Sequence, residues 1–478
     1  MYDTIKDMEP QNTETVTVTV PAVTPPPAVP PPTESPKKSF PAVLIIVPVV
    51  LALLVGIFFA ARYLISRFGS GGSSAGSGEI TWWDLWENQS VVGPLITEYE
   101  QSHPNVKINF VAQDKEDYRE RLTSALARGA GPDIFNFHNS WVPMFKNDLD
   151  VLPASIMSPA DFASVYYPVT LNDLTSGTGI VGLPLGYDGL GLYINQDIFE
   201  TTGRTVPTTW DDLRQTAIAL TIKDEAGVIQ QAGVALGRTE NVDHWQEILG
   251  LMMLQNKVNL ANPIGQNAED ALTFYTIFAS VDGVWDSTLP SSTQAFAGGK
   301  LAMYFGPSWQ AFTIKAVNPN LKFKIVPVPQ LPKDTPSEPN VAYATYWVQG
   351  VSKKSTNKAL AWDFLKFMAS RESLQKMYQN AAAQRAFGEP YPLVDMAGLV
   401  VGDGLVDGIL SQAPYAQSWY LASKTFDGPT GINSQMSKYF EDAINSVNSG
   451  VRAGDALTTV AQGVNQVLST YGLTLPTQ

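Results

Sequence analysis

A glycine-rich stretch from Ile180 to Leu213 constrains the fold of this chain more than any other part of the sequence. Its first half, IVGLPLGYDGLGLYIN, separates apolar residues by mostly small ones, which indicates bent, extended backbone lying close to other backbone. A short helix is predicted from Gln196 to Thr202, because Gly203 follows as a left-handed stop. A second helix is predicted to open at Trp210, directly after a threonine that can cap it. The stretch therefore predicts a strand that crosses from one α/β body to another.

Length and charge limit the kinds of protein that this chain can be. Its 478 residues leave room for two or three domains. Residues 79–478 carry the whole net charge of −14, because five Lys and Arg before them balance five Asp and Glu. An acidic body with scattered basic residues argues against a nucleic acid as partner.

The sequence contains no cysteine and three histidines. The absence of cysteine excludes disulfides, thiolate metal sites, a cysteine nucleophile and a lipid attached through an N-terminal cysteine. No pair among His103, His138 and His244 has the spacing of metal ligands. We therefore expect neither a bound metal nor another cofactor.

Three segments are predicted to precede the globular body. Residues 1–39 are polar and then proline-rich, which favours a disordered tail. Residues 40–62 are predicted to form a transmembrane anchor, because 22 residues from Phe40 to Ala61 lack a charge. A cleaved signal peptide or a buried core helix is the alternative, but the long polar segment before the apolar run disfavours a signal peptide. Residues 63–78 are rich in Gly and Ser and predict a flexible linker.

Strands alternate with helices in the body. Strands are predicted at Ile80–Trp83, Val106–Val111 and Asp133–Phe137, with helices between them. This order predicts parallel βαβ units in a doubly wound sheet, where ligands bind beyond the carboxyl ends of the strands. Polar and aromatic residues follow each of these strands. We therefore expect them to gather on one edge of the sheet.

A second extended stretch, Val341–Val351, is interpreted as the return crossing, and one helix is predicted over Lys358–Tyr378. The fold class predicted is α/β, with two doubly wound lobes joined by crossing hinge strands. The boundaries predicted are 79–186 plus 346–383 for lobe 1, and 187–345 plus 384–478 for lobe 2.

No motif in the sequence requires catalysis. Gly177–Gly182 matches G-x-G-x-x-G, but it leads into a strand instead of a helix, so a turn is the better interpretation. The carboxylate pair Asp211–Asp212 lies at a predicted helix N-terminus, where the helix dipole explains it. Six tryptophans, in contrast, lie at element ends beside polar residues. Each alone fits a core edge as well as a binding surface, but together they favour an aromatic-lined cleft, as sugars require.

Several segments resemble one known family in order along the chain. They are ITWW with LITEYEQSHPNVKINF, then ALARGAGPDIFNFHNSWV, the crossing stretch, AFAGGKLAMYFGPSW and KALAWDFLKFMASRESLQKMY. Together they are similar to the family-1 bacterial extracellular solute-binding proteins, the sugar-binding subunits of ABC importers. The resemblance runs from about Ile80 to the C-terminus. It implies a periplasmic-binding-protein-like fold of type II whose two lobes close on a ligand.

The resemblance also implies which residues touch the sugar. Stacking is expected from Trp86, Trp141 and Trp309, and hydrogen-bond acceptance from Asp84, Glu87 and Asp188. The full set of expected contact residues, the last four of which align more loosely, is Asp84, Trp86, Glu87, Asn139, Ser140, Trp141, Tyr187, Asp188, Trp309, Trp245, Tyr346, Trp347 and Trp419.

The function predicted is that of a solute-binding protein, not an enzyme. It captures a carbohydrate, an oligosaccharide in particular, by hinge closure and delivers it to an ABC permease. It is expected to be a monomer anchored in the cell membrane by a single pass, with its body on the extracytoplasmic side. Members of the family are usually free or anchored by a lipid, so the anchor and the proline-rich tail depart from the pattern. Three alternatives stay open: a receptor domain that signals through the anchor, a carbohydrate-cleaving enzyme, and the importer role for another polar solute.

Overall fold

The computed structural model describes residues 77–177, 179–333 and 335–473. The chain divides into two units at Ser73, and all described residues belong to the second unit. The predicted tail and anchor, and all but the last two residues of the predicted linker, lie outside the described residues. None of the described helices combines the length and the apolarity needed to cross a membrane.

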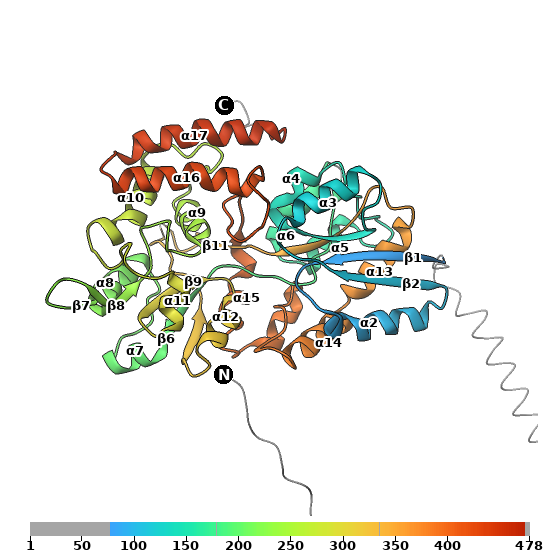
Figure 1. Ribbon diagram of the computed structural model, residues 1–478, viewed down its shortest axis with the longest axis horizontal. Helices are drawn as coiled ribbons and strands as arrows, with labels where there is room; N and C mark the ends of the chain where they lie inside the picture. The colour runs from blue at the N-terminus through green and yellow to red at the C-terminus, as the bar shows by residue number, and fades with distance from the viewer. Residues whose placement is uncertain (1–76, 178, 334, 474–478) are drawn as a thin grey trace, which may run out of the picture. The chain divides into compact units, whose positions relative to one another are not determined.

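Four strands form the first sheet, in the order β12-β3-β1-β2. Strand β1 pairs in parallel with β2 and β3, whereas β12 pairs antiparallel with β3 (Figure 1). The three predicted strands in this part of the chain are confirmed, although β1 begins two residues earlier, at Gly78. The sheet consists of β1 (Gly78–Asp84), β2 (Val106–Ala112), β3 (Ile134–His138) and β12 (Trp347–Val351). The helices associated with it are α2 (Gln89–Ser102), α3 (Tyr118–Ala127), η1 (Asn139–Trp141), α4 (Val142–Phe145), α5 (Pro159–Val165) and α6 (Pro168–Leu174).

Five strands form the second sheet, in the order β10-β6-β9-β8-β7. Only β8 and β9 pair in parallel, and the other neighbours pair antiparallel. The sheet consists of β6 (Gly191–Asn195), β7 (Ile222–Lys223), β8 (Ile229–Val234), β9 (Leu301–Gly306) and β10 (Phe323–Val326). The helices in this part of the chain are α7 (Gln196–Thr202), α8 (Trp210–Leu220), α9 (Trp245–Gln255), α10 (Gln266–Ser280), α11 (Ser292–Ala297) and α12 (Gln310–Val317).

The remaining described elements are four short strands outside the two large sheets, together with the helices of the C-terminal part of the chain. The single helix predicted over Lys358–Tyr378 is wrong, because the structure divides it into two helices. The Ser370 side chain accepts a hydrogen bond from the Ser373 backbone N–H and starts a new helix there. These elements are β4 (Thr175–Ser176), β5 (Gly179–Ile180), β11 (Ala342–Tyr343), α13 (Lys358–Met368), α14 (Arg371–Ala382), η2 (Val394–Val400), α15 (Asp407–Leu410), η3 (Ala413–Tyr415), β13 (Ala416–Gln417), α16 (Ile432–Asn448) and α17 (Ala453–Thr470).

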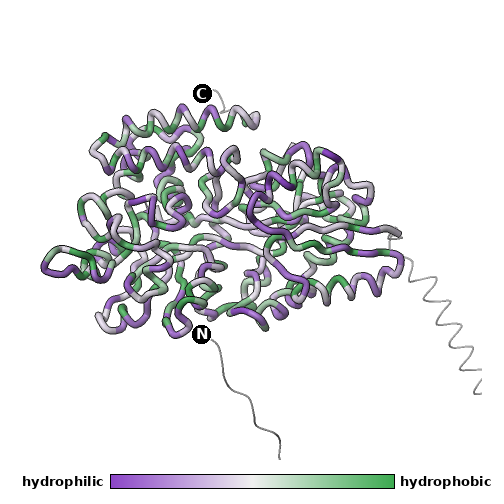
Figure 2. Tube along the Cα trace, viewed as in Figure 1, coloured by the Kyte–Doolittle hydropathy of each residue, from purple (hydrophilic) through white to green (hydrophobic). Residues whose placement is uncertain are grey.

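The C-terminal helices show why these residues fold as helices. In α16, Met436, Phe440 and Ile444 recur every four residues and are buried, whereas the residues between them are mostly polar. Hydrophilic and hydrophobic residues alternate along α16 and α17, which lie side by side (Figure 2). Each helix therefore buries one apolar stripe and leaves its polar face to solvent.

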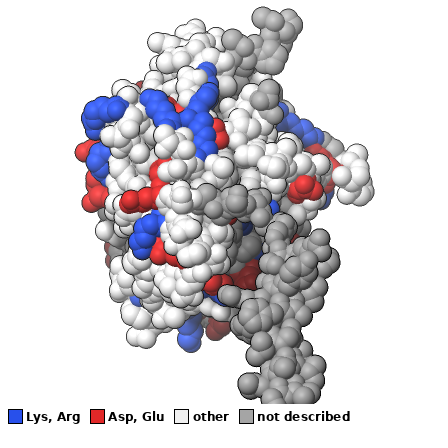
Figure 3. All heavy atoms as spheres, turned by 90° about the vertical axis from the view of Figure 1, so that its right-hand side faces the viewer, with Lys and Arg blue, Asp and Glu red and all other residues white. Residues whose placement is uncertain are grey.

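The surface carries charges of both signs. On the face shown in Figure 3, Lys and Arg lie in small groups beside Asp and Glu, and most of the surface is uncharged. Most ion pairs among the described residues involve exposed side chains, such as Lys438 with Asp442. Pairs of this kind contribute little to stability, so the apolar core must supply most of it.

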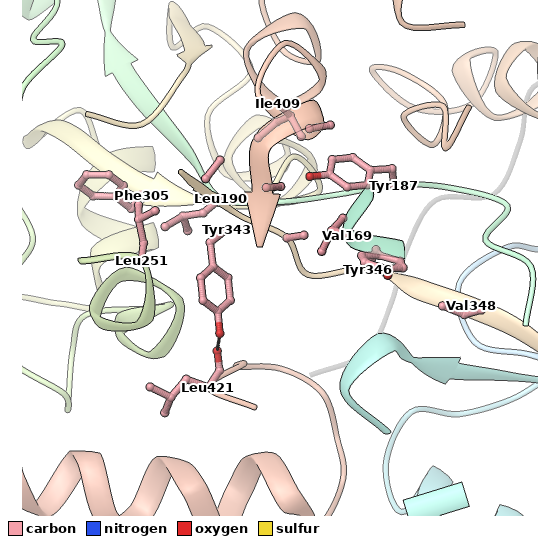
Figure 4. Packing of buried hydrophobic residues seen from close by; sticks show 14 of the residues in the cluster. Val169, Tyr187, Leu190, Leu251, Phe305, Tyr343, Tyr346, Val348, Ile409 and Leu421 are labelled. Carbon is pink, nitrogen blue, oxygen red and sulfur yellow. Dashed lines mark hydrogen bonds between the residues drawn. The ribbon is translucent and has the colours of Figure 1, made fainter. Parts of the chain in front are cut away.

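The two crossing segments pair with each other. Leu183 and Gln349 exchange backbone hydrogen bonds of 2.9 and 3.1 Å, which forms an antiparallel bridge. A second bridge joins Gly189 to Ala344. Tyr343, which belongs to the return segment, also contacts the C-terminal part of the chain. Its hydroxyl donates there to the Leu421 carbonyl at 2.7 Å (Figure 4). The predicted close approach of backbone to backbone is confirmed at Gly189, where a Cβ would lie 2.6 Å from the Tyr343 carbonyl oxygen.

We expect Gly189→Ala to destabilise the protein by about 2 kcal/mol or more, because the added methyl group has to push the Tyr343 carbonyl away. Denaturant unfolding of the variant measures this change. Gly398→Ala is the matched control, because nothing lies within 4 Å of a Cβ there. Equal stability of the two variants would contradict the close packing at Gly189.

Candidate ligand-binding site

Two of the predicted tryptophans are more exposed than the others. Trp86 is 38% exposed and Trp309 is 37% exposed. The Trp86 ring lies 5.2 Å from that of Trp347, which in turn lies 5.3 Å from Trp141. Trp141 is fully buried behind these rings, so in this conformation it supports the aromatic surface and does not face a ligand. Phe426 extends the surface, with its ring 6.2 Å from Trp86.

Asp84 holds the loop that carries Trp86. One carboxylate oxygen accepts the backbone N–H groups of Trp86 and Glu87, at 2.8 and 3.0 Å. The other accepts from the Gln349 and Asn136 side-chain amides. Burial raises the pKa of Asp84, and these hydrogen bonds oppose that rise. The structure thus places Asp84 as an internal support of the loop after β1.

Glu87 lies next to Trp86 and forms an ion pair that the sequence did not reveal. Its Oε1 accepts from Arg385 at 2.6 Å, and the same guanidinium nitrogen donates to Glu389 at 2.9 Å. Burial and the nearby Glu389 carboxylate raise the pKa of Glu87 to about 8, although Arg385 lowers it. Arg385 and Glu389 follow α14, a region in which no resemblance pointed to the site.

Asp188 holds the segment that carries Trp309. Its Oδ1 accepts the Ser308 backbone N–H at 3.0 Å, and its Oδ2 accepts the Ser308 hydroxyl at 2.8 Å. Ser308 precedes Trp309, which is the N-cap residue of α12. Burial raises the pKa of Asp188 to about 7. Like Asp84, Asp188 fixes the backbone beside an exposed tryptophan.

Asp173 joins two predicted site residues and was not predicted itself. Its Oδ2 accepts from the Asn139 amide at 2.9 Å and from the Tyr346 hydroxyl at 2.8 Å. Its Oδ1 accepts from the Ser418 hydroxyl at 2.5 Å. Tyr187 stacks on Tyr346, with ring centroids 5.9 Å apart. Three distant chain segments therefore meet at one carboxylate of α6, a helix that has no clear signature in the sequence.

Ser140 links η1 to the C-terminal helices. Its hydroxyl donates to the Asn433 side chain at 2.8 Å and lies 2.7 Å from His138 Nδ1. Trp419 is half-buried against Tyr420 and Phe440, so it contributes to the same region from the C-terminal part.

A buried polar cluster lies beside Trp309. His244 Nδ1 is 2.8 Å from the Ser423 hydroxyl, and Glu247 Oε1 accepts from the Ser423 N–H at 2.7 Å. The His244 ring lies 5.6 Å from that of Trp309. Burial raises the pKa of Glu247 to about 7 and lowers the pKa of His244 to about 4. Trp245, the first residue of α9, is buried next to this cluster.

Several buried polar atoms here have no hydrogen-bond partner within the described part of the protein. They include Glu87 Oε2, Trp141 Nε1 and Glu247 Oε2. Leaving such an atom unpaired costs about 1–3 kcal/mol, which water can recover, as can a hydroxyl-bearing ligand that reaches Glu87 or Glu247. Across residues 77–177, 179–333 and 335–473, no group of three His, Asp or Glu side chains could hold a metal ion. Exposed indole rings therefore lie near polar atoms that can still form hydrogen bonds.

A separate cavity lies away from these residues. A cavity of about 450 Å³ is lined by the end of α9 and by residues of the following loops, among them Leu254, Gln330 and Pro339. None of the thirteen predicted contact residues lines it. Its walls carry no exposed tryptophan and no unpaired buried carboxylate, so we assign the candidate site to the region of Trp86 and Trp309.

Much of the chain is similar in sequence to known proteins. Residues 85–375 match the family described as "Bacterial extracellular solute-binding protein". A protein of Brucella abortus (strain 2308) named only as a binding protein is 24% identical over 329 residues, which cover 64% of this chain and 76% of that protein.

Solved structures share the fold at low sequence identity. The sugar-binding protein MalE of Xanthomonas citri is 17% identical, with a TM-score of 0.66 over 82% of this chain and 98% of its own. The cyclic α-maltosyl-1,6-maltose binding protein of Arthrobacter globiformis is 17% identical, with a TM-score of 0.65 over 83% and 100%. These likenesses show the α/β periplasmic-binding-protein fold that the sequence predicted.

The buried Glu247 predicts a pH dependence of stability. Its pKa of about 7 in the folded protein lies above the ordinary 4.5, so the folded state keeps its proton longer. The stability that this proton provides is complete below pH 4.5 and is lost as the pH rises through 7. Glu247→Gln lacks this loss, and we expect its stability relative to the wild type to rise by about 3 kcal/mol between pH 4.5 and 7.5.

Denaturant unfolding of both proteins from pH 4.5 to 7.5 measures the difference. Glu200→Gln is the matched control, because Glu200 is exposed on α7. The expectation fails if the two Gln variants show the same dependence on pH.

Proposed function

The chain belongs to the family of bacterial extracellular solute-binding proteins, and we propose that it captures a carbohydrate, an oligosaccharide in particular, and delivers it to an ABC permease. One observation carries the proposal. Two exposed tryptophans, Trp86 and Trp309, are held by buried carboxylates beside polar atoms that lack partners. Indole rings stack on the C–H faces of sugars, while the polar atoms bind hydroxyl groups. Members of this family bind solutes, so the protein is a binding protein and not an enzyme.

The ligand is proposed to be an oligosaccharide because structures with the same fold contain bound oligosaccharides. One structure with the same fold contains maltotetraose and another contains mannobiose. Two separate tryptophans also suit a ligand with more than one ring. A monosaccharide remains the second candidate, since a third structure of this fold contains tagatose.

Closure about the paired crossing segments is the proposed mechanism. Trp86 belongs to the part of the chain with the first sheet, and Trp309 to the part with the second. A ligand that touches both tryptophans favours the conformation in which they approach each other, by as much as its affinity differs between the conformations. The lobe boundaries proposed are those of the sequence, 79–186 plus 346–383 and 187–345 plus 384–478.

The contact residues are proposed in two groups. Trp86, Trp309, Trp347 and Trp419 supply the faces on which sugar rings stack. Glu87, Asn139, Ser140, Tyr187 and Tyr346 supply or orient hydrogen bonds. Four residues support the contact surface from beneath, where they hold the backbone or fill the core under the exposed rings: Asp84, Asp188, Trp141 and Trp245.

The protein is proposed to sit at the cell membrane with its binding body on the extracytoplasmic side. The family is extracellular, and the uncharged run of 22 residues before the body has the length of a single membrane pass. A short Gly/Ser linker after it would let the body reach a permease in the same membrane.

We expect one or more of glucose, maltose, maltotetraose and mannobiose to raise the melting temperature of the full-length protein in detergent micelles. A ligand that binds only the folded state stabilises it by about 2.7 kcal/mol at one hundred times its Kd. Trp309→Ala should weaken binding by about 2 kcal/mol, roughly 30-fold, because the stacking face is lost.

Ile264→Ala provides the control, since Ile264 is 53% exposed but lies outside the proposed site. It should keep the full thermal shift. Cooperative melting without a shift for any of the four sugars would reject the carbohydrate assignment and favour another polar solute.

A further inference from the structure

Arg385 lies where three parts of the fold meet. Its guanidinium donates from Nη2 to Glu87 and Glu389, at 2.6 and 2.9 Å, and from Nε to the Phe387 carbonyl at 3.1 Å. The same group lies 5.2 Å from the centre of the Phe312 ring. An arginine can do this because its planar fork pairs with carboxylates at the edge while its face packs on an aromatic ring.

The contact with Glu87 reaches the first exposed tryptophan. Glu87 follows Trp86 directly, and Asp84 holds the backbone N–H groups of both residues. The Glu87 side chain is 8% exposed, so its orientation is fixed by Arg385 and its surroundings. Any shift of Glu87 must therefore move the loop that presents Trp86.

The contact with Phe312 reaches the second exposed tryptophan. Phe312 lies three residues after Trp309, and its backbone N–H donates to the Trp309 carbonyl at 3.0 Å. The Phe312 ring also packs against Phe387, with centroids 4.5 Å apart, next to Arg385. Arg385 and Phe387 thus press on the first turn of α12, the turn that presents Trp309.

We infer that Arg385 is a positioning residue that couples the Trp86 loop to the Trp309 turn, so that a structural change at one tryptophan alters the environment of the other. The inference rests on the proposed function only for its effect on ligand affinity. Burial and Glu389 raise the pKa of Glu87 while Arg385 lowers it, so loss of the arginine favours a protonated, loosely held Glu87. The two carboxylates then lose their common partner, and the loop and the turn lose their connection.

The coupling can be measured without a ligand. The full-length protein, labelled with 5-fluorotryptophan, gives fluorine resonances that Trp86→Phe and Trp309→Phe assign. We expect Arg385→Met to shift both resonances. Glu87→Gln should also shift the Trp309 resonance, although Glu87 makes no hydrogen bond to α12. If Arg385→Met does not fold, Glu87→Gln decides alone, since it conserves size and shape.

Arg214→Met is the matched control. Arg214 also forms a fork with a buried carboxylate, at 2.7 and 2.8 Å from Asp282, but it lies on α8, away from both tryptophans. The Arg214→Met variant should be less stable than the wild type, but the fluorine resonances of Trp86 and Trp309 should not shift. The inference is overturned if Glu87→Gln shifts Trp86 alone, or if Arg214→Met shifts the two resonances as much as Arg385→Met.

A binding measurement then separates this inference from the proposed function. With maltotetraose as the first probe, Arg385→Met and Glu87→Gln should weaken binding about tenfold and Arg214→Met should not. Coupled resonances without binding of maltotetraose or any other sugar tested would reject the function and keep the coupling. Binding that is equal in all variants, with resonances that do not move, would reject the coupling and keep the function.

Discussion

The antiparallel pairing of the two crossing segments is the constraint on which the rest of this body depends. Gly189 lies so close to the Tyr343 carbonyl that only glycine fits, and the bridge between Leu183 and Gln349 fixes the register. A slip of one residue would turn every side chain of a segment to its other face. Each segment also contributes one side chain that supports an exposed tryptophan. Gln349 donates to Asp84 behind the Trp86 loop, and Asp188 binds Ser308 before Trp309.

The buried carboxylates of the region act first on the protein itself. Asp84 and Asp188 accept backbone N–H groups, and Asp173 gathers three side chains. A charged carboxylate is costly to bury unless such partners surround it, so these groups fix the loops that they bind. The aromatic rings reach solvent where these loops end. The rigid part of the candidate site is therefore made of acids, and its exposed part of indole rings.

The sequence predicted the elements whose ends carry local signals. The helix Gln196–Thr202 has Gly203 as its stop, and the helix that opens at Trp210 is capped by Thr209, whose side chain accepts from the Asp212 N–H. Such signals depend on a few neighbouring residues. The crossing and return segments could also be predicted, because glycine in an extended segment indicates that another backbone lies close to it.

The sequence could not show contacts between distant segments. Arg385 meets Glu87 across 298 positions, and Asp173 meets Ser418 across 245. Nothing near Asp173 distinguishes it from an ordinary surface aspartate, because its partners are chosen by the fold. For the same reason the sequence grouped Trp141 with Trp86, although one is buried and the other exposed. Spacing along the chain identifies element ends, whereas burial depends on which elements pack over them.

The electrostatics of the region fit a neutral ligand with many hydroxyl groups. Burial raises the pKa of Glu87 to about 8 and those of Asp188 and Glu247 to about 7, so at neutral pH each carboxyl group lies near its titration midpoint. A cation would have to displace Arg385 from Glu87 at 2.6 Å, and an anion would be repelled by each of these carboxyl groups when it is ionised. A hydroxyl group donates to a carboxylate and accepts from a carboxylic acid, so it can bind either form. Neutral sugars combine that adaptability with C–H faces that stack on indole rings, which is why the proposed function assigns a sugar to Trp86 and Trp309.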